Sequence, residues 1–146
     1  MIRQIFVALA VVASLLTARG ENVTFGGKTY ELGPRTLLLS HDAKVGNYTY
    51  NDAVKALDAV SRSGMSNVTL LVEPSVYWLD DPDDPTVRRS KVNSNSVPFA
   101  VEVNCDTLSI IGLAENPEDV VFAVNRGQTQ GALGNYTMMH FTGNSL

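Results

Sequence analysis

Hydrophobic and polar positions divide this chain into three parts. A strongly apolar N-terminal run is followed by one stretch with helical periodicity, and from Asn67 onward the apolar positions form short β-type runs. These runs are Val68–Val72, Val97–Val103, Leu108–Ile111, Val120–Val124 and Thr137–Phe141. Short runs bounded by turn residues are typical of an all-β sandwich or a parallel coil of strands. No Asn-Gly hairpin signal joins consecutive runs, which favours the parallel coil.

The stretch with helical periodicity predicts one helix at residues 50–63. Three apolar residues at helical spacing would form its buried stripe: Val54, Leu57 and Val60. Thr49 is the predicted N-cap, Asp52 complements the helix dipole, and Gly64 is a natural stop. Because an apolar stripe needs a partner, we expect this helix to cover the open end of the strand coil.

Two shorter features are predicted before the helix. Asn22–Tyr30 alternates weakly around Gly26 and Gly27, which indicates a hairpin or a cap strand with a tight turn. Leu37–Leu39 is a second short apolar run that follows a Gly-Pro break.

Residues 1–20 have the layout of a secretory signal peptide. Arg3 precedes an apolar run, and Ala18 and Gly20 place small residues before a cleavage site at Glu21. The run is too short for a membrane span, which needs about 20 apolar residues; the alternative is a buried core helix. We therefore expect a secreted or periplasmic protein whose mature part, residues 21–146, does not span a membrane.

The charge balance narrows the range of partners. The whole chain has a formal net charge of −4, from 11 basic and 15 acidic residues. Loss of Arg3 and Arg19 with the leader leaves 9 basic residues and a charge of −6. An acidic protein is a poor ligand for nucleic acid or an anionic membrane surface. Cys105 is the only cysteine, so no internal disulfide forms, and we expect it to pack as a small hydrophobic residue.

One segment carries a family resemblance. Residues 48–77 read YTYNDAVKALDAVSRSGMSNVTLLVEPSVY. They resemble the start of pectin methylesterases, where a helix of the form tIqeAVdAvp leads into the strand and turn vtIyIkpGvY. Leu108–Gly112 is similar to the following strand, ItliG. The resemblance covers about two thirds of the chain and implies a mainly β fold, the pectin-lyase-like right-handed parallel β-helix with one short N-terminal capping helix.

The chain also departs from the family pattern. Ser75 stands where the family has glycine, Trp78-Leu79-Asp80 replaces an Arg-Glu turn, and a long polar insertion extends from Asp80 to Pro98. The two aspartates, the arginine and the glutamines that the family uses in catalysis belong to later coils, beyond Leu146. We therefore expect residues 21–146 to be the N-terminal turns of a longer β-helix domain and predict no catalytic residue in them.

A polar loop between the last two β-type runs is the predicted substrate-binding segment. Its candidate residues are Arg126, Gln128, Thr129 and Gln130. In the resembled family a threonine of this region touches the substrate, and Thr129 is the nearest match. The alternative is an ordinary turn, because loops carry function only where a scaffold orients them.

Two further features offer groups that could bind a metal ion or transfer a proton. The acidic run Asp80–Asp84 offers carboxylates suited to calcium but has no calcium-loop spacing, so a solvated loop is the preferred interpretation. His140 lies in an apolar run, and a satisfied histidine on a coil wall is preferred over a general base because no catalytic partner is evident. We predict no metal site and no cofactor.

The sequence thus predicts part of a secreted, monomeric protein that acts on pectin. Hydrolysis of the methyl esters of polygalacturonate is the leading function, in which one carboxylate attacks the ester and a second acts as an acid. The alternatives are a pectate or polysaccharide lyase of the same fold and a non-catalytic carbohydrate-binding or adhesin coil.

Overall fold

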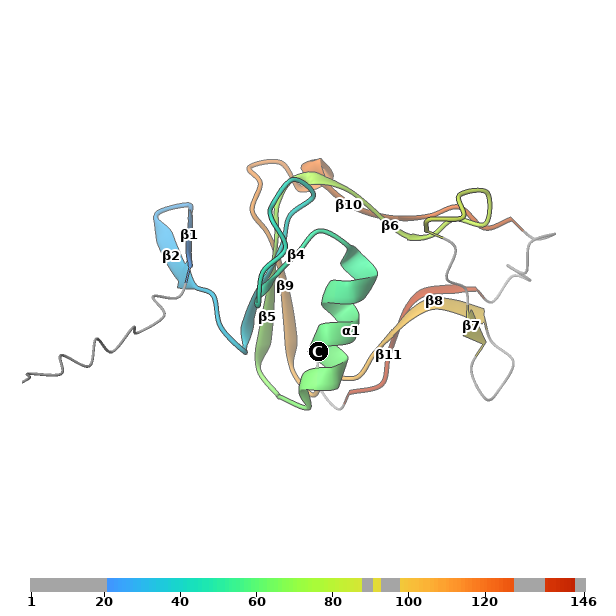
Figure 1. The fold of residues 1–146 in the computed structure, drawn as a ribbon, viewed down its shortest axis with the longest axis horizontal. Helices are drawn as coiled ribbons and strands as arrows, with labels where there is room; N and C mark the ends of the chain where they lie inside the picture. The colour runs from blue at the N-terminus through green and yellow to red at the C-terminus, as the bar shows by residue number, and fades with distance from the viewer. Residues whose placement is uncertain (1–20, 88–90, 93–97, 128–135, 144–146) are drawn as a thin grey trace, which may run out of the picture.

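The computed structural model describes residues 21–87, 91–92, 98–127 and 136–143 (Figure 1). This part of the chain is mainly β, with one α-helix and several small parallel sheets. The elements are β1 (Asn22–Phe25), β2 (Lys28–Glu31), β3 (Thr36–Leu39), β4 (Thr49–Tyr50), α1 (Ala53–Ser63), β5 (Val68–Val72), β6 (Ser75–Asp80), β7 (Lys91–Val92), β8 (Pro98–Val103), β9 (Leu108–Gly112), the 3₁₀ turn η1 (Pro117–Asp119), β10 (Val120–Val124) and β11 (Thr137–Phe141).

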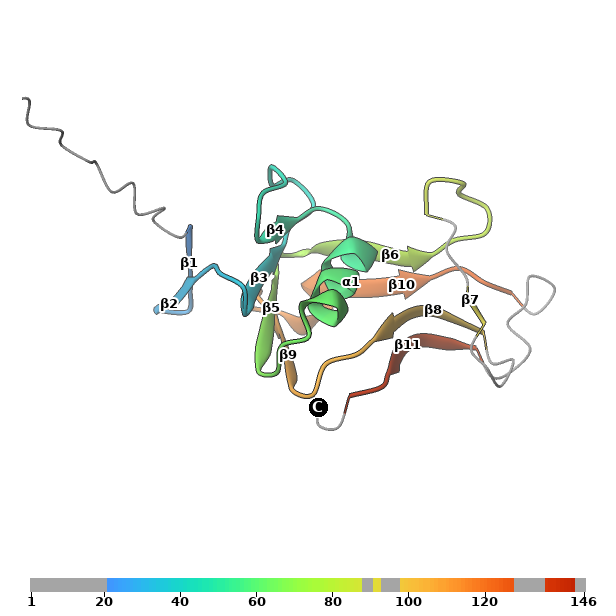
Figure 2. The same ribbon diagram turned by 60° about the horizontal axis from the view of Figure 1, so that its bottom comes forward.

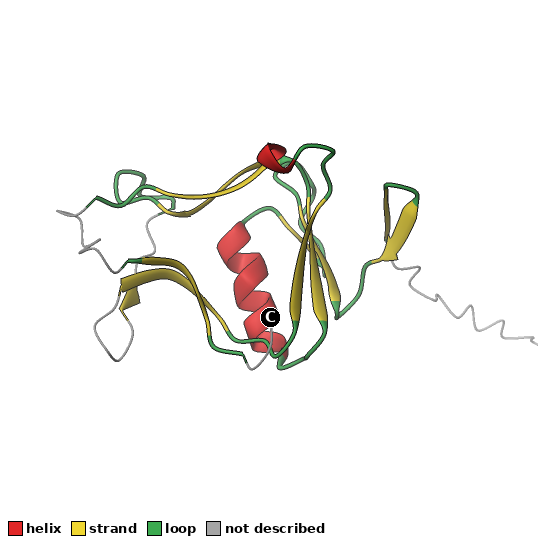
Figure 3. Cartoon of the chain, turned by 180° about the vertical axis from the view of Figure 1, so that it is seen from behind, coloured by secondary structure: helices red, strands yellow, loops and turns green. Residues whose placement is uncertain are grey.

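Strands return to the same three sheets in the same order. The first set, β5, β6 and β8, is placed in three different sheets, and β9, β10 and β11 then pair with them in parallel. The registers join Val68 to Leu108, Ser75 to Val120 and Phe99 to Thr137. Consecutive strands of each set therefore do not pair with one another (Figures 1 and 3), although β8 pairs antiparallel with the preceding short strand β7.

The three sheets differ in their remaining strands. β3 and β4 extend the sheet of β5 and β9, which has the order β4-β3-β5-β9. The short β7 pairs antiparallel with β8 on the side opposite β11. β9, β10 and β11 each occupy an edge of their sheet within the described part of the chain.

The N-terminal hairpin is confirmed. β1 and β2 pair antiparallel through a turn at Gly26 and Gly27, whose φ angles of 57° and 75° suit glycine. This hairpin projects from the rest of the molecule (Figure 1).

The helix forms, but it begins later than predicted. Asp52 is the N-cap, and its carboxylate accepts a hydrogen bond of 3.0 Å from the backbone N–H of Lys55. The prediction of Thr49 as N-cap is wrong, because Thr49 and Tyr50 form β4 and pair with β3. The helix ends as expected at Gly64, which has a left-handed conformation.

The predicted apolar stripe of α1 is confirmed as the centre of the core. Val54, Leu57 and Val60 are buried and pack in one cluster with residues of all three sheets. Figure 1 shows α1 between the β3–β5–β9 strands and the two other sheets, and Figure 2 shows the same placement from another side. The buried face of α1 thus packs against apolar side chains of all three sheets.

β5 is buried on both faces, which explains its continuous apolar sequence. Leu70 faces the cluster around α1, whereas Leu71 packs in a second cluster on the other side of the sheet. The other buried members of that second cluster are Leu32, Leu38 and Leu113.

β6 was not predicted, because Pro74-Ser75 was interpreted as part of a turn. Its side chains alternate in the period-2 pattern of a strand. Tyr77 and Leu79 are buried, whereas Val76 and Trp78 are exposed. The Tyr77 hydroxyl donates to the carbonyls of Leu39 and Glu73, and burial raises the pKa of this phenol.

The turn after β11 packs directly on the turn after β8. The backbone N–H of Thr142 donates to the Val103 carbonyl at 3.0 Å, and Gly143 lies against the Cys105 carbonyl so closely that a Cβ would overlap it. Cys105 is buried, as predicted, and its thiol contacts the carbonyls of Met65 and Thr107.

None of the helices in the described ranges combines the length and the hydrophobicity that a membrane span requires.

Candidate functional site

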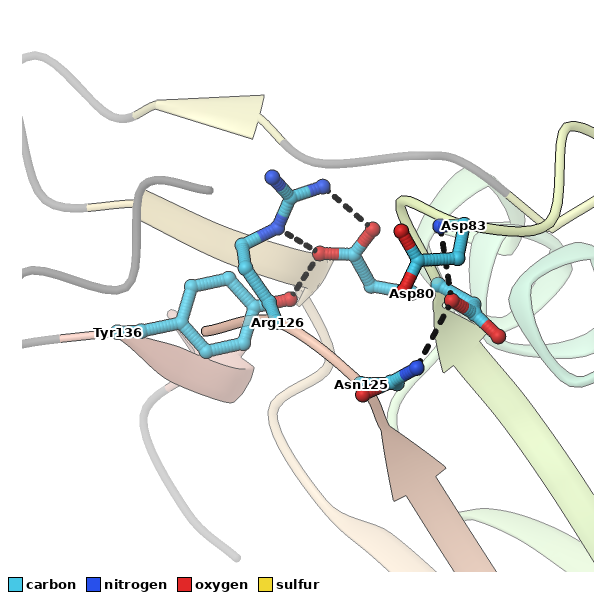
Figure 4. Close-up of polar contacts among 6 residues, drawn as sticks. Asp80, Asp83, Asn125, Arg126 and Tyr136 are labelled. Atoms are coloured by element: carbon cyan, nitrogen blue, oxygen red, sulfur yellow. Dashed lines mark hydrogen bonds and ion pairs between the residues drawn. The ribbon is translucent and has the colours of Figure 1, made fainter. Parts of the chain in front are cut away.

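A buried polar cluster lies where β6 and β10 end. Parallel neighbours end at the same edge of a sheet, and Val124 is the register partner of Asp80. Arg126 follows Val124 by two residues and turns back toward the Asp80 carboxylate (Figure 4). Asp80 and Arg126 are 46 residues apart in the sequence, and this parallel pairing brings them together.

The Asp80–Arg126 pair is bidentate. Arg126 Nε donates to Asp80 Oδ2 at 2.5 Å, and Arg126 Nη2 donates to Asp80 Oδ1 at 2.8 Å. The side chain of Asp80 is 0% exposed and that of Arg126 is 8% exposed. Two charge-assisted bonds in a desolvated position fix the orientation of both groups.

Tyr136 completes the cluster from the residue just before β11. Its hydroxyl donates to Asp80 Oδ2 at 2.5 Å, and its ring centroid lies 6.0 Å from Arg126 Cζ (Figure 4). Burial, followed by the hydrogen bond to Asp80, raises the pKa of Tyr136 well above its ordinary value. The same carboxylate raises the pKa of Arg126, so the cluster consists of a carboxylate, a guanidinium and a neutral phenol.

This arrangement suits an anchor better than a reacting group. Both oxygens of Asp80 accept charge-assisted or phenolic hydrogen bonds, and the side chain has no exposed surface. A nucleophile or general base needs an oxygen within reach of the substrate. Instead, Asp80 holds Arg126 and Tyr136, the residues on either side of the chain segment 127–135.

Of the four predicted substrate-binding residues, only Arg126 can be placed. It is the buried partner of Asp80 described above. Gln128, Thr129 and Gln130 lie outside the described residues, so their predicted role in binding stays a prediction.

The acidic run was predicted as a solvated loop, and this is wrong for Asp80. Two of the carboxylates after it, those of Asp81 and Asp84, shape the following turns. Asp81 accepts hydrogen bonds from Asn125 Nδ2 at 3.2 Å and from the backbone N–H of Asp83 at 3.0 Å. Asp84 accepts from the hydroxyl and the N–H of Thr86, and these bonds lower its pKa. Within the described ranges, no group of three or more His, Cys, Asp or Glu side chains is arranged to hold a metal ion.

Both histidines lie outside this cluster. His140 faces Glu102, its register partner, with Nδ1 3.4 Å from the carboxylate in an ion-pair position that lacks hydrogen-bond geometry. Its ring packs on Phe99 with centroids 5.6 Å apart, but Nδ1 makes no hydrogen bond to the described residues, so the preferred interpretation of a satisfied histidine is not confirmed. His41 pairs with Asp42 on the exposed surface.

A separate hollow of about 790 Å³ lies between the N-terminal hairpin and the start of β3. Glu21, Arg35 and Met65 are among its lining residues, and no member of the Asp80 cluster lines it. Its mixed charges point to no particular ligand.

The missed members of the site, Asp80 and Tyr136, could be found only through the parallel register. Aligning Ser75–Asp80 with Val120–Val124 places Asp80 next to the residues before Arg126. Comparisons with protein-family models, with curated proteins and with solved structures found no match for this chain.

Proposed function

We propose that this chain forms the first coils of a right-handed parallel β-helix of the pectin-lyase type and belongs to a secreted pectin methylesterase. The observation that carries the proposal is the return of β9, β10 and β11 to the sheets of β5, β6 and β8 in the same order. One coil of such a helix contributes one strand to each sheet, and each coil buries its apolar face only against its neighbours. Parallel crossover connections are right-handed in nearly all cases, which sets the proposed hand.

The position of α1 supports the same fold. The helix covers the interior on one side through Val54, Leu57 and Val60. On the other side, the edges of β9, β10 and β11 offer backbone groups and half-buried apolar side chains to a further coil. The proposal therefore assigns α1 the role of N-terminal cap that the resemblance implies.

The contribution of this chain to the reaction is substrate positioning. Asp80 fixes Arg126 and Tyr136, and so fixes both ends of the segment that contains Gln128, Thr129 and Gln130. Binding groups perform well only when a rigid support orients them. We propose that this segment contacts the polygalacturonate chain while the carboxylates that attack and protonate the ester lie on later coils.

Methanol release tests this function. The protein purified from its natural source is incubated with highly methyl-esterified pectin, and methanol is measured together with the ultraviolet absorbance of unsaturated products. The proposal predicts methanol without unsaturated products, and it predicts neither product from residues 21–146 alone. Polygalacturonate is incubated in parallel. Unsaturated product from it would instead identify a lyase, and no product from either substrate would contradict both enzyme functions.

A further inference from the structure

The outer face of the β6–β10 sheet is apolar and exposed. Tyr77 and Leu79 point from β6 toward the core, so Val76 and Trp78 point away from it. Val121 is the register partner of Val76, and Ala123 is the register partner of Trp78. Val76 is 48%, Trp78 43% and Val121 37% exposed. In Figure 1 this sheet has α1 on one side only.

Polar groups adjoin this apolar face at the carboxyl end of the two strands. Asp81 follows β6, Asn125 follows β10, and their side chains are joined by the 3.2 Å hydrogen bond. Asp81 Oδ2 and Asn125 Oδ1 accept no hydrogen bond from any residue that the structure describes, and the indole N–H of Trp78 donates to none. An exposed aromatic ring on a strand that leads into polar groups with open acceptors fits a ligand that is apolar on one face and rich in hydroxyls at its edge.

We infer that this face, defined here as the Trp78 platform (Val76, Trp78, Val121 and Ala123, with Asp81 and Asn125 at its end), binds an uncharged sugar unit by stacking. Sugar rings present C–H groups on one face and hydroxyls around the edge, which matches the order of apolar and polar groups along β6 and β10.

The charge of Asp81 selects among the sugars that a pectin methylesterase would meet. The inference rests on that proposed function. Asp81 places a carboxylate at the end of the platform, in a chain with a net charge of −4. A free uronate would approach this carboxylate as a like charge, whereas its methyl ester is neutral. The Trp78 platform is therefore expected to prefer methyl-esterified over unesterified galacturonan.

The chain contains its own reporter for this test, because Trp78 is its only tryptophan. The chain is titrated with methyl-esterified and with unesterified galacturonan oligosaccharides while tryptophan emission is recorded. We expect a saturable change in emission with the esterified oligosaccharide. The Kd of the unesterified oligosaccharide should be higher by roughly tenfold or more. Asp81→Asn should narrow that ratio.

Calorimetry with variants separates stacking from general adhesion. Trp78→Ala should weaken binding of the esterified oligosaccharide about tenfold or more, because truncation of an aromatic anchor removes a large share of the binding free energy. Met138→Ala alters a side chain of similar exposure on β11 and should leave binding unchanged. The far-ultraviolet spectrum and melting temperature of each variant show whether it folds.

Three results would overturn the inference: no emission change with either sugar, equal affinity for both sugars, or an emission change that depends on protein concentration without sugar. The last would show that a second copy covers the platform. Binding by the platform without methanol release from the natural protein would contradict the proposed esterase and leave the platform standing. Methanol release without binding by the platform would support the proposed esterase and contradict the role of the platform.

Discussion

At the scale of single residues, Asp80 is the position where the fold depends most on charge. Taking a carboxylate and a guanidinium out of water is costly, and only good geometry with further hydrogen bonds offsets that cost. Asp80 has both, from the two bonds of Arg126 and the bond of Tyr136. Removing one member of this cluster leaves the others buried without their partner.

Asp80→Asn should therefore destabilise the protein strongly. The amide keeps the size of the side chain but leaves the Arg126 charge uncompensated, and breaking a buried pair in this way costs about 3–5 kcal/mol. Urea unfolding of the purified chain measures the loss. Asp42→Asn is the matched control, because the Asp42 side chain is 98% exposed and its replacement should change the unfolding free energy by less than about 0.5 kcal/mol. Equal effects of the two substitutions would show that the cluster does not form.

Tyr136 predicts a specific dependence of stability on alkaline pH. Its pKa is raised in the folded state, so the folded protein holds this proton more tightly than the unfolded chain. The resulting stabilisation is fully present below about pH 10, the ordinary tyrosine pKa, and is lost as the pH rises toward the higher folded-state value.

Tyr136→Phe removes this contribution. The unfolding free energy of the wild type should fall more steeply above about pH 10 than that of the variant, by up to about 1.4 kcal/mol per pH unit. Tyr77, whose pKa is also raised, is present in both proteins, so the difference between the two slopes isolates Tyr136. Parallel curves would contradict the burial of this phenol and its hydrogen bond to Asp80.

At the scale of elements, apolar periodicity predicted what is buried better than where elements begin. The stripe of α1 and the strand β5 follow from apolar spacing because those side chains are buried, whereas β9, β10 and β11 were recognised as short apolar runs although their side chains are mostly half-buried or exposed. The start of α1 was misjudged because Thr49 and Asp52 are both good caps, and pairing of Thr49 with Leu38 decides between them. β6 was missed because Pro74-Ser75 resembles a turn, although Tyr77 and Leu79 alternate as strand residues do.

Leu57→Asp tests the central role of α1. Leu57 has no exposed surface, so the substitution removes about 1.5–3 kcal/mol of apolar burial and adds a buried charge. We expect a loss of more than about 3 kcal/mol in unfolding free energy, which thermal or denaturant unfolding measures. Lys55→Asp, on the exposed side of the same helix, is the control for charge and helix propensity. A melting temperature unchanged by Leu57→Asp would show that this face is not buried.

At the scale of the whole molecule, contacts between strands far apart in the sequence create the site, and those contacts are the part that sequence reasoning missed. Arg126 was selected as a polar residue between two strands, but its partner, Asp80, lies on β6. Apolar periodicity does not show that two residues 46 positions apart in the sequence are in contact. Tyr136 was missed for the same reason, since its contact with Asp80 spans 56 residues. The overall mainly β character was predictable because short apolar runs dominate the chain after Asn67.

The fold, the Asp80 cluster and the proposed function all depend on parallel pairing between one set of strands and the next. A designed disulfide between Thr69→Cys and Ser109→Cys measures that pairing directly, because these residues are register partners on β5 and β9. Neighbouring strands lie about 4.8 Å apart, which is within the Cα separation that a disulfide spans.

The controls are the two single variants, which retain Cys105, and the pair Thr69→Cys with Ile111→Cys, which is two residues out of register. We predict a linked peptide by mass spectrometry in high yield after mild oxidation of the register pair, with little linkage in the controls. Absence of that link in the folded protein, or equal linkage of the out-of-register pair, would contradict the account.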